Sequence, residues 1–368
     1  MIYADNAATT KLDIDAFEAM KPFLLEEYGN ASQPYSFANS AKRALKKARE
    51  TIAKCIGAFP DEIYFTSGGT ESDNWAIKIA SGEGDIITSS IEHHAVLNAC
   101  NVMEKRGRSV KYIPVSREGI VELEYLENSV TEKTRLISIM YANNEIGTIQ
   151  PIKQIAEIAH KNNCLFHTDA VQAVGHVRIN VRDLDIDLLS ASAHKFNGPK
   201  GVGFLYVKRG TQVSAYLNGG SQEKGLRAGT ENVAGIVAMA VALEKNCISI
   251  EHNAKILNDY EKILLKQLRM AKLNFMCNGS GQKIPGNISL SFADVDGEMI
   301  LHRMDLQGIC ISTGAACDSV KTQLSHVIKA IGIPERFAEG TIRISLGKDN
   351  TKEDVDYIAK TLITIFKK

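Results

Sequence analysis

Short apolar segments alternate with segments of helical periodicity along the chain up to residue 250. The apolar segments are rich in β-branched residues, are bounded by polar residues, and fall at residues 62–66, 85–89, 110–115, 135–141, 164–169 and 201–207. Between them lie stretches such as PIKQIAEIAHKNN (residues 151–163), in which apolar residues recur with helical spacing. Near-continuous apolar strands separated by helices are typical of a sheet covered on both faces. The sequence therefore predicts an α/β fold with a mainly parallel sheet.

The pattern changes after residue 250. The segment EHNAKILNDYEKILLKQL begins at residue 251 and places apolar side chains on one helical face, namely Ile256, Tyr260, Ile263, Leu264 and Leu268. A strand (residues 287–292), a helix, a second strand (residues 341–346) and a final helix follow. A chain of 368 residues also exceeds the size of one ordinary core. We predict an N-terminal segment (1–14) that packs on the small domain, a large domain (15–250) and a small α+β domain (251–368).

The composition argues against several classes of partner. Lysine plus arginine number 43, as do aspartate plus glutamate, so there is no net basic charge to attract nucleic acid or an anionic membrane. The start lacks the basic and apolar regions of a signal peptide, and the apolar run VAGIVAMAVAL from Val233 is shorter than a membrane span. Seven cysteines without a CxxC pair do not indicate a disulfide framework. We expect a cytoplasmic protein without nucleic-acid or membrane partners.

A glycine-rich turn in FTSGGTESDN joins a predicted strand to a predicted helix. The strand ends at Thr66, the chain turns through Gly68 and Gly69, and the helix begins at Thr70. Backbone N–H groups at a helix N-terminus bind phosphate, and glycine lets the anion come close. An ordinary strand-to-helix turn is the alternative. The segment matches neither the Walker motif nor GxGxxG, so a nucleotide bound in the usual way is not indicated.

Polar side chains follow two further predicted strands. Asp169 and Gln172 follow the strand at residues 164–169, and the stretch Asn143, Asn144 and Glu145 follows the strand at residues 135–141. The carboxyl ends of parallel strands are where α/β proteins place ligands. A carboxylate at this place can keep a ring nitrogen protonated, or it can cap the helix that follows.

Two adjacent histidines, His93 and His94, open another predicted helix. Neighbouring residues on a helix point in different directions, so the pair is a poor chelate, and the spacing of helical zinc motifs is absent. No metal site is expected. One of the two histidines could instead stack on a flat cofactor or carry a proton.

The segment SASAHKFNGPKGVG (residues 190–203) contains two lysines among glycines and other small residues. A lysine that forms a Schiff base, together with an aspartate for the pyridinium nitrogen, is what pyridoxal 5'-phosphate requires. We therefore predict that Lys195 holds the cofactor aldehyde and that the small residues leave room for the ring. Lys200, inside the GPKG turn, is predicted to be structural.

Cys317 lies in STGAACDSVKTQ, a stretch of small and polar residues without periodicity. Cysteines are usually buried and behave as small hydrophobes, and Cys247 fits that pattern. The surroundings of Cys317 predict instead an accessible loop that carries a reactive thiol.

These motifs, in this order, resemble the class V aminotransferase family and, within it, the NifS/IscS-type (group I) cysteine desulfurases. The segments that carry the resemblance are DNAATT, FTSGGTESDN, EHHAVL, ANNEIGTIQPI, HTDAVQAVG, SAHKFNGPKGVG, GLRAGTEN, STGAAC and RISLG. The resemblance implies the type I fold of pyridoxal phosphate enzymes and a homodimer. It also implies an enzyme that takes sulfur from L-cysteine, leaves L-alanine, and passes the sulfur as a persulfide to an acceptor such as an iron–sulfur scaffold.

The family's site residues map onto matching positions of this chain. The resemblance implies that Lys195 forms the Schiff base, that Asp169 pairs with the pyridine nitrogen, and that His93 stacks on the ring and carries protons. Cys317 would be the nucleophile, Arg343 would bind the substrate carboxylate, and Asn144 would also contact the substrate. The phosphate and the ring hydroxyl would be bound by Gly69, Thr70, Ser192, His194, Asn144, Gln172 and, from the partner subunit, Thr230.

Three other functions remain open on the sequence. A selenocysteine lyase, sulfinate desulfinase or small-acid aminotransferase of class V would keep the same cofactor residues. A non-catalytic sulfur-relay subunit would keep the fold without turnover. A metal hydrolase would be built on His93, His94, His167 and Asp169.

Overall fold

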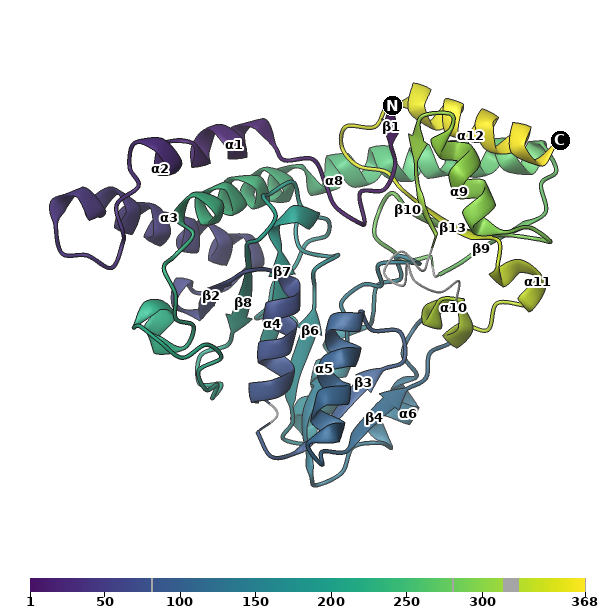
Figure 1. Cartoon of the computed structure of the whole chain (residues 1–368). Coiled ribbons are helices and arrows are strands. Elements are labelled where there is room, and N and C mark those ends of the chain that lie inside the picture. The colour runs from purple at the N-terminus through teal and green to yellow at the C-terminus, as the bar shows by residue number, and fades with distance from the viewer. Residues whose placement is uncertain (81, 280, 314–323, 368) are drawn as a thin grey trace.

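A computed structural model describes residues 1–80, 82–279, 281–313 and 324–367. Its central feature is a seven-stranded sheet with the order β2-β8-β7-β6-β5-β3-β4, which lies in the lower part of Figure 1. The strands are β2 (Ile63–Thr66), β3 (Asp85–Ser89), β4 (Val110–Ile113), β5 (Thr134–Ser138), β6 (Leu165–Asp169), β7 (Leu188–Ser192) and β8 (Gly203–Val207). Strand β8 runs antiparallel to both of its neighbours, β2 and β7, whereas the other neighbouring pairs of this sheet are parallel. The predicted α/β fold with a mainly parallel sheet is confirmed.

Strand β7 is absent from the sequence-based prediction. Its residues, LLSAS, include no β-branched or aromatic side chain, and such side chains are what usually mark a strand. All five residues are nevertheless buried between β6 and β8. The small serine and alanine side chains suit this position because the strand runs directly into the Lys195 turn.

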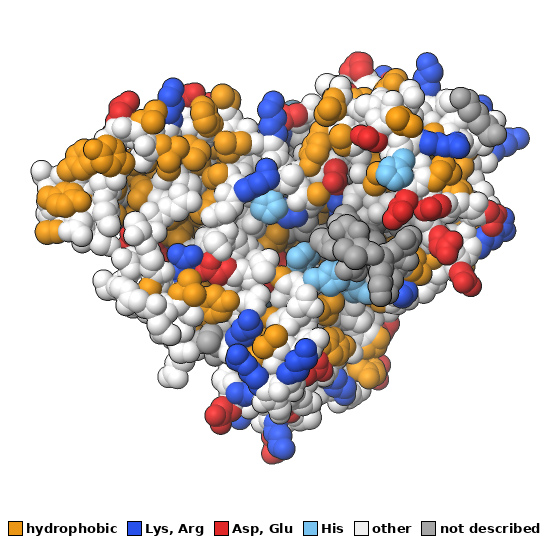
Figure 2. Space-filling view, viewed as in Figure 1, with side chains coloured by type: hydrophobic (Ala, Val, Ile, Leu, Met, Phe, Trp, Pro, Cys, Tyr) orange, Lys and Arg blue, Asp and Glu red, His pale blue; other side chains and the backbone are white. Residues whose placement is uncertain are grey.

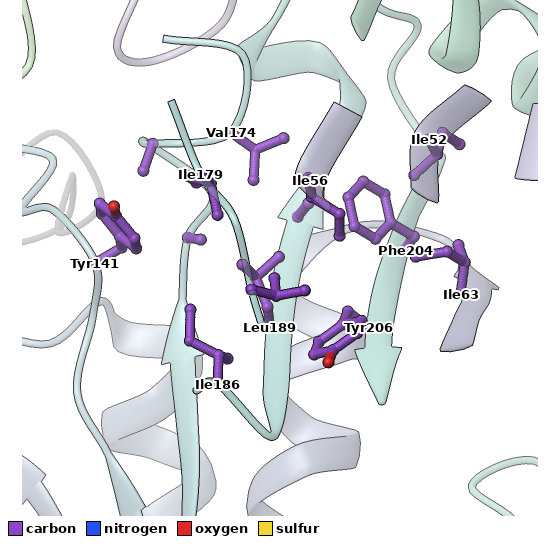
Figure 3. Close-up of a cluster of buried hydrophobic side chains, with 14 of the residues drawn as sticks. Ile52, Ile56, Ile63, Tyr141, Val174, Ile179, Ile186, Leu189, Phe204 and Tyr206 are labelled. Carbon is purple, nitrogen blue, oxygen red and sulfur yellow. The ribbon is translucent and has the colours of Figure 1, made fainter. Parts of the chain in front are cut away.

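Both faces of the sheet are covered by helices. Successive side chains of a strand point to opposite faces, and Leu188 and Leu189 of β7 accordingly belong to different hydrophobic clusters. One cluster includes Ile52 and Ile56 of α3 (Asn39–Ile56), which lie near Phe204 in Figure 3. The other cluster contains side chains from α4 (Gly69–Trp75) and α5 (His94–Lys105). The further large-domain helices are α1 (Ile14–Met20), α2 (Pro22–Leu25), α6 (Leu123–Glu127) and α7 (Ile152–Lys161).

A 38-residue helix, α8 (Val233–Met270), joins the two parts of the chain. Its first half packs in the large-domain core through Ile236, Met239 and Leu243, and its second half contributes Leu257 and Leu264 to a separate cluster. The boundary predicted near residue 250 therefore falls inside one continuous helix. By length and composition α8 could cross a membrane, but 56% of its most apolar window is buried inside the protein.

The C-terminal part is an antiparallel sheet with the order β12-β13-β10-β9, packed against helices (upper right in Figure 1). Its strands are β9 (Phe275–Cys277), β10 (Asn287–Phe292), β12 (Ser312–Thr313) and β13 (Thr341–Ser345). Its helices are α9 (Gly297–Asp305), α10 (His326–Ala330), α11 (Glu335–Ala338) and α12 (Lys352–Phe366).

The N-terminal segment connects the two parts a second time. Strand β1 (Ile2–Tyr3) pairs in parallel with β11 (Ile309–Cys310) of the C-terminal part. A few residues later the Thr10 N–H donates to the His194 carbonyl at 2.9 Å, and the Thr10 hydroxyl accepts from the Asn197 N–H at 2.7 Å. The segment therefore runs from the small domain into the turn that carries Lys195.

Candidate active site

A cavity of about 310 Å³ lies at the carboxyl ends of the parallel strands, between the large domain and β13. In Figure 2, histidine side chains gather in the middle of the visible face, as expected for a cavity whose wall contains four of them. The cavity brings together ten of the site residues predicted from sequence: Gly69, Thr70, His93, Asn144, Asp169, Gln172, Ser192, His194, Lys195 and Arg343. Thr230 is exposed and is not among the residues that line it. Cys317 lies outside the described residues.

Lys195 ends a short 3-10 turn that follows β7 directly. Its ammonium donates to the carbonyls of Ala7 at 2.6 Å and Ala8 at 2.9 Å. Gly198 makes the turn possible, because a Cβ at that position would lie 2.7 Å from the Cβ of Ala193. The small residues around the lysine are thus explained by a tight turn against the N-terminal segment, with the amine directed into the cavity.

The turn between β2 and α4 forms one wall of the cavity. Gly68 has φ +152°, and a Cβ on Gly69 would come within 2.5 Å of a Val171 methyl group, so the close approach of these segments needs glycine. The Nδ1 of His194 forms a hydrogen bond of 3.1 Å with the Thr9 hydroxyl. Burial and the charge of Lys195 lower the pKa of His194 to about 4, so its ring is neutral at neutral pH. A neutral imidazole beside a glycine turn that opens a helix suits a phosphate group.

Asp169 ends β6 with its carboxylate at the cavity and only 5% of the residue exposed. One oxygen accepts the Val171 N–H at 2.9 Å, which is the local capping role considered as the alternative from the sequence. Burial raises the pKa of this carboxyl, and electrostatic interactions with Lys195 and with the His93 ring oppose that rise. A buried carboxylate of this kind is well placed to pair with a protonated ring nitrogen.

His93 is the N-cap of α5, and its Nδ1 accepts the Ala95 N–H at 3.1 Å. The proton of the neutral ring is therefore assigned to Nε2. Burial lowers the pKa of His93, with the Asp169 charge opposing that shift. The ring can thus act as a neutral hydrogen-bond donor and proton carrier beside the cofactor position.

The metal-hydrolase alternative requires His167 to join His93, His94 and Asp169. His167 is fully buried between the hydroxyls of Ser138 and Ser190, at 2.8 and 2.9 Å, and it does not line the cavity. Within the described ranges no cluster of three or more histidine, cysteine or acidic residues could hold a metal ion. The histidines of this site are therefore arranged for hydrogen bonding.

Arg343 reaches the cavity from β13, a strand of the C-terminal part. Its Nη1 donates to the Asn144 carbonyl at 3.0 Å and its Nη2 to the Asp5 carboxylate at 2.7 Å. Its Nε is buried and has no partner among the residues that the structure describes. A buried guanidinium with spare donors can bind a carboxylate through a two-pronged contact.

Four contributors to the site were missed in the sequence analysis. Ala7 and Ala8 hold the lysine through backbone carbonyls, and the sequence carries no signal for such a contact. Asp73 lines the cavity with a buried carboxyl whose pKa is raised well above its usual range by burial and by the charge of Asp169. Ser325 donates to Glu145 at 2.6 Å and anchors the chain just after the undescribed residues 314–323. Asp5 lies in the motif DNAATT and Asp73 in the motif FTSGGTESDN. These motifs could have pointed to the two residues only through their resemblance to the family.

Comparisons with known proteins point to the same family as the sequence motifs. The profile of the family described as "Aminotransferase class-V" matches residues 2–358. The cysteine desulfurase IscS of Dictyoglomus turgidum is 48% identical over 100% of this chain and 95% of its own length, and that of Methanosarcina thermophila is 46% identical over 100% and 92%. A solved NifS-like protein superposes with a TM-score of 0.94 at 40% identity, covering 100% of this chain and 99% of its own. A structure described as SspA in complex with cysteine gives a TM-score of 0.83 at 36% identity, covering 94% and 99%.

Proposed function

The chain belongs to the class V aminotransferase family, and we propose that the cavity described above is where it removes sulfur from L-cysteine. The chain is 46–48% identical to cysteine desulfurases over its full length, and it is therefore a pyridoxal 5'-phosphate-dependent enzyme with that activity. The observation that carries the assignment of the site is the placement of Lys195, Asp169 and Arg343 in the wall of one cavity. These residues supply an amine, a ring-nitrogen carboxylate and a carboxylate-binding cation, which are the groups that the reaction needs.

The cavity fits the cofactor. Gly68 and Gly69 contribute no side chain of their own to this wall, and Thr70, Ser192 and His194, which line the same cavity, would hold the phosphate. When bound, pyridoxal phosphate supplies an aldehyde for an amine and a protonated ring that accepts electrons from Cα. Lys195 would hold the aldehyde and Asp169 the ring-nitrogen proton. Gln172 and Asn144 would lie near the ring hydroxyl, and His93 beside the ring.

The chain's own groups then have separate tasks. We assign removal of the Cα proton to the Lys195 amine, which the Ala7 and Ala8 carbonyls orient by hydrogen bonds. His93, neutral because burial lowers its pKa, would carry protons to and from the substrate. Arg343 would bind the α-carboxylate of cysteine with the donors that the protein leaves available.

Cys317 is the proposed sulfur acceptor within the chain. Its thiolate would attack the substrate sulfur, so that the substrate C–S bond breaks, an S–S bond forms, and the carbon skeleton leaves as L-alanine after protonation. The chain on both sides of residues 314–323 reaches the cavity, which supports this role. Ser312 pairs with Arg343 in the β12–β13 ladder, and Ser325 and His326 line the cavity.

The test is the release of alanine and sulfide from L-cysteine in the presence of a thiol reductant. Lys195→Ala should abolish turnover, because Lys195 is the lysine that lines the cavity among the residues the structure describes, while the phosphate wall and Asp169 retain some cofactor. Cys317→Ser should still change the cofactor absorbance when cysteine is added but should release no sulfide. Near-native turnover in either variant contradicts the assignment. A preference for selenocysteine or cysteine sulfinate over cysteine would favour the other class V activities.

The assembly is a proposed homodimer in which Thr230 enters the partner's cavity. Thr230 is exposed in the single chain, and a set of exposed apolar side chains lies on α1, α2 and the segment after them: Ile14, Phe17, Leu24, Leu25, Tyr28, Tyr35 and Phe37. Hydrophobic side chains also collect over this end of the molecule in Figure 2 (upper left). Analytical ultracentrifugation should give twice the chain mass, and a monomer with full cofactor affinity would contradict the proposal.

The expected acceptor is a cytoplasmic sulfur-accepting protein such as an iron–sulfur scaffold.

A further inference from the structure

Asp5 forms an ion pair with Arg343 although the two residues lie 338 positions apart in the chain. The carboxylate Oδ1 is 2.7 Å from Nη2, and the two side chains are 18% and 5% exposed. The pairing follows from the backbone, because the N–H of Asn6 donates to the Ser345 carbonyl at 3.0 Å and that of Ser345 donates to the Ala4 carbonyl at 2.7 Å. Asp5 is thereby held beside β13, next to the strand position of Arg343.

The donors of Arg343 are only partly used by the protein. A guanidinium carries five N–H groups. One donates to the Asn144 carbonyl and one to Asp5, whereas the buried Nε has no partner within the described part of the chain. A buried cation is costly unless it is paired, so the empty site needs a carboxylate at this position. Asp5 is the acidic residue that forms an ion pair with Arg343 among the residues described.

We propose that Asp5 is an internal carboxylate that competes with the α-carboxylate of the ligand for Arg343, and so sets how tightly substrate and product are held. The inference rests on the proposed role of Arg343 in binding cysteine. Asp5 neutralises the guanidinium when the site is empty, and it reduces the positive potential that an incoming carboxylate meets. Substrate and product carry the same α-carboxylate, so a clamp without Asp5 would bind cysteine more tightly but would also retain alanine.

A role for Asp5 in orienting Arg343, instead of competing for it, predicts a different change in ligand binding. If Asp5 acted only by orienting the guanidinium for the ligand, its removal would weaken binding of every α-carboxylate. The two roles therefore predict changes of opposite sign in the same measurement. A purely structural role would change thermal stability without discriminating between ligands that have and lack a carboxylate.

The experiment compares wild-type holoenzyme with Asp5→Asn, which keeps the side-chain shape and removes the charge. L-Alanine and cysteamine, which has no carboxylate, are titrated while the cofactor absorbance is followed, and KM for L-cysteine is measured separately. We expect the alanine dissociation constant and the cysteine KM to fall together by about three- to tenfold, with partial solvent screening limiting the effect, and cysteamine binding to stay unchanged. Asp15→Asn is the matched control, since Asp15 is in the same segment, pairs with Lys245 and has an exposed side chain.

A double-mutant cycle locates the effect. In an Arg343→Gln background, Asp5→Asn should leave alanine binding unchanged, because the group for which the two carboxylates compete is gone. Unchanged or weaker alanine binding in Asp5→Asn alone, or an equal gain for cysteamine, overturns the proposal. If Asp5→Asn does not fold, Asp5→Ser removes the same charge and is judged by the same criteria. Alanine titration does not depend on turnover, so failure of the desulfurase assignment would appear separately, as no sulfide from wild type.

Discussion

Buried ionisable groups surround the cofactor position, and burial shifts each pKa toward the neutral form of the group. Burial raises the pKa of the Asp169 carboxyl, and interactions with His93 and Lys195 oppose that rise. Burial also raises the pKa of Glu92, and there the opposing interactions are hydrogen bonds. Glu92 is fully buried, and its Oε1 accepts from the Ser89 hydroxyl at 2.5 Å and from the Met140 N–H at 2.9 Å. Two buried carboxyls near the cavity are therefore balanced by different neighbours.

The free energy of unfolding should depend on pH through Glu92. Burial raises the pKa of this carboxyl from 4.5 to about 8. The folded protein therefore binds this proton more tightly than the unfolded chain does. The stability that the proton contributes is complete below pH 4.5 and is lost as the pH rises towards 8. Glu92→Gln, a neutral isostere, should make the variant more stable relative to wild type at pH 8 than at pH 5, by about 2–4 kcal/mol.

Urea unfolding of both proteins at pH 5 and pH 8 checks this expectation. Glu104→Gln, on the exposed side of α5, is the control for a change of net charge. An equal difference between variant and wild type at both pH values would mean that Glu92 is ionised in the folded protein throughout.

At the scale of elements, the β2–α4 turn and the segment after β6 must approach closely to form the phosphate wall. The limiting contact is between Gly69 and Val171, since a Cβ on the glycine would lie 2.5 Å from a valine methyl group. Gly69→Ala should therefore push the two segments apart. Overpacking of this kind costs about 1–3 kcal/mol, so we expect cofactor affinity to fall by roughly tenfold or more.

A second substitution at the Gly69–Val171 contact should restore the cofactor affinity lost in Gly69→Ala. Val171→Ala removes the methyl group that the new Cβ would meet, so the double variant Gly69→Ala/Val171→Ala should recover most of the lost affinity. Equilibrium titration of the apoprotein with pyridoxal phosphate gives the three dissociation constants. Weak binding that persists in the double variant would show that the glycine is needed for direct approach of the phosphate, not for packing against Val171.

At the scale of the whole molecule, the site is divided between two bodies that α8 and the N-terminal segment hold together. Lys195 and Asp169 belong to the large domain, whereas Arg343 belongs to β13 of the small one. The middle of α8 lies between the two hydrophobic clusters that its halves join. We therefore expect the geometry of substrate binding to depend more on the straightness of this helix than cofactor binding does.

Ser249→Pro tests this division. Proline inside a helix removes a hydrogen bond, clashes with the preceding turn and costs about 3 kcal/mol. We expect the variant to keep its cofactor absorbance but to raise KM for cysteine by roughly tenfold, because Arg343 moves relative to Lys195. Ser249→Ala loses the hydroxyl contacts to the Lys245 carbonyl at 2.9 Å, the Asn246 carbonyl at 3.3 Å and the Asn253 side-chain amide at 3.2 Å, but it keeps the helix backbone and should behave as wild type. An unchanged KM in the proline variant would mean that the N-terminal segment alone fixes the two domains.

Much of this arrangement can be predicted from sequence because it depends on local chemistry. Alternating apolar strands and helices predict the α/β class, and the residues after the strands at 164–169 and 135–141 predict which side chains meet at one edge of the sheet. Lys195 is recognisable because its turn needs glycine and small residues within a few positions. Strand β7 was missed since its serines and alanines carry no strand propensity, and only the neighbouring strands β6 and β8 stabilise it there.

The sequence by itself determined the class of fold and the family, and it predicted the cofactor lysine, since each rests on residues close together or on motifs in order. The tertiary structure decided what no local pattern contains. It placed Asp5 on Arg343, the Ala7 carbonyl on Lys195, and one helix across the expected domain boundary. The physical reason is that such contacts arise from packing of segments hundreds of residues apart, where backbone hydrogen bonds and burial, and not the identity of neighbouring residues, choose which groups meet.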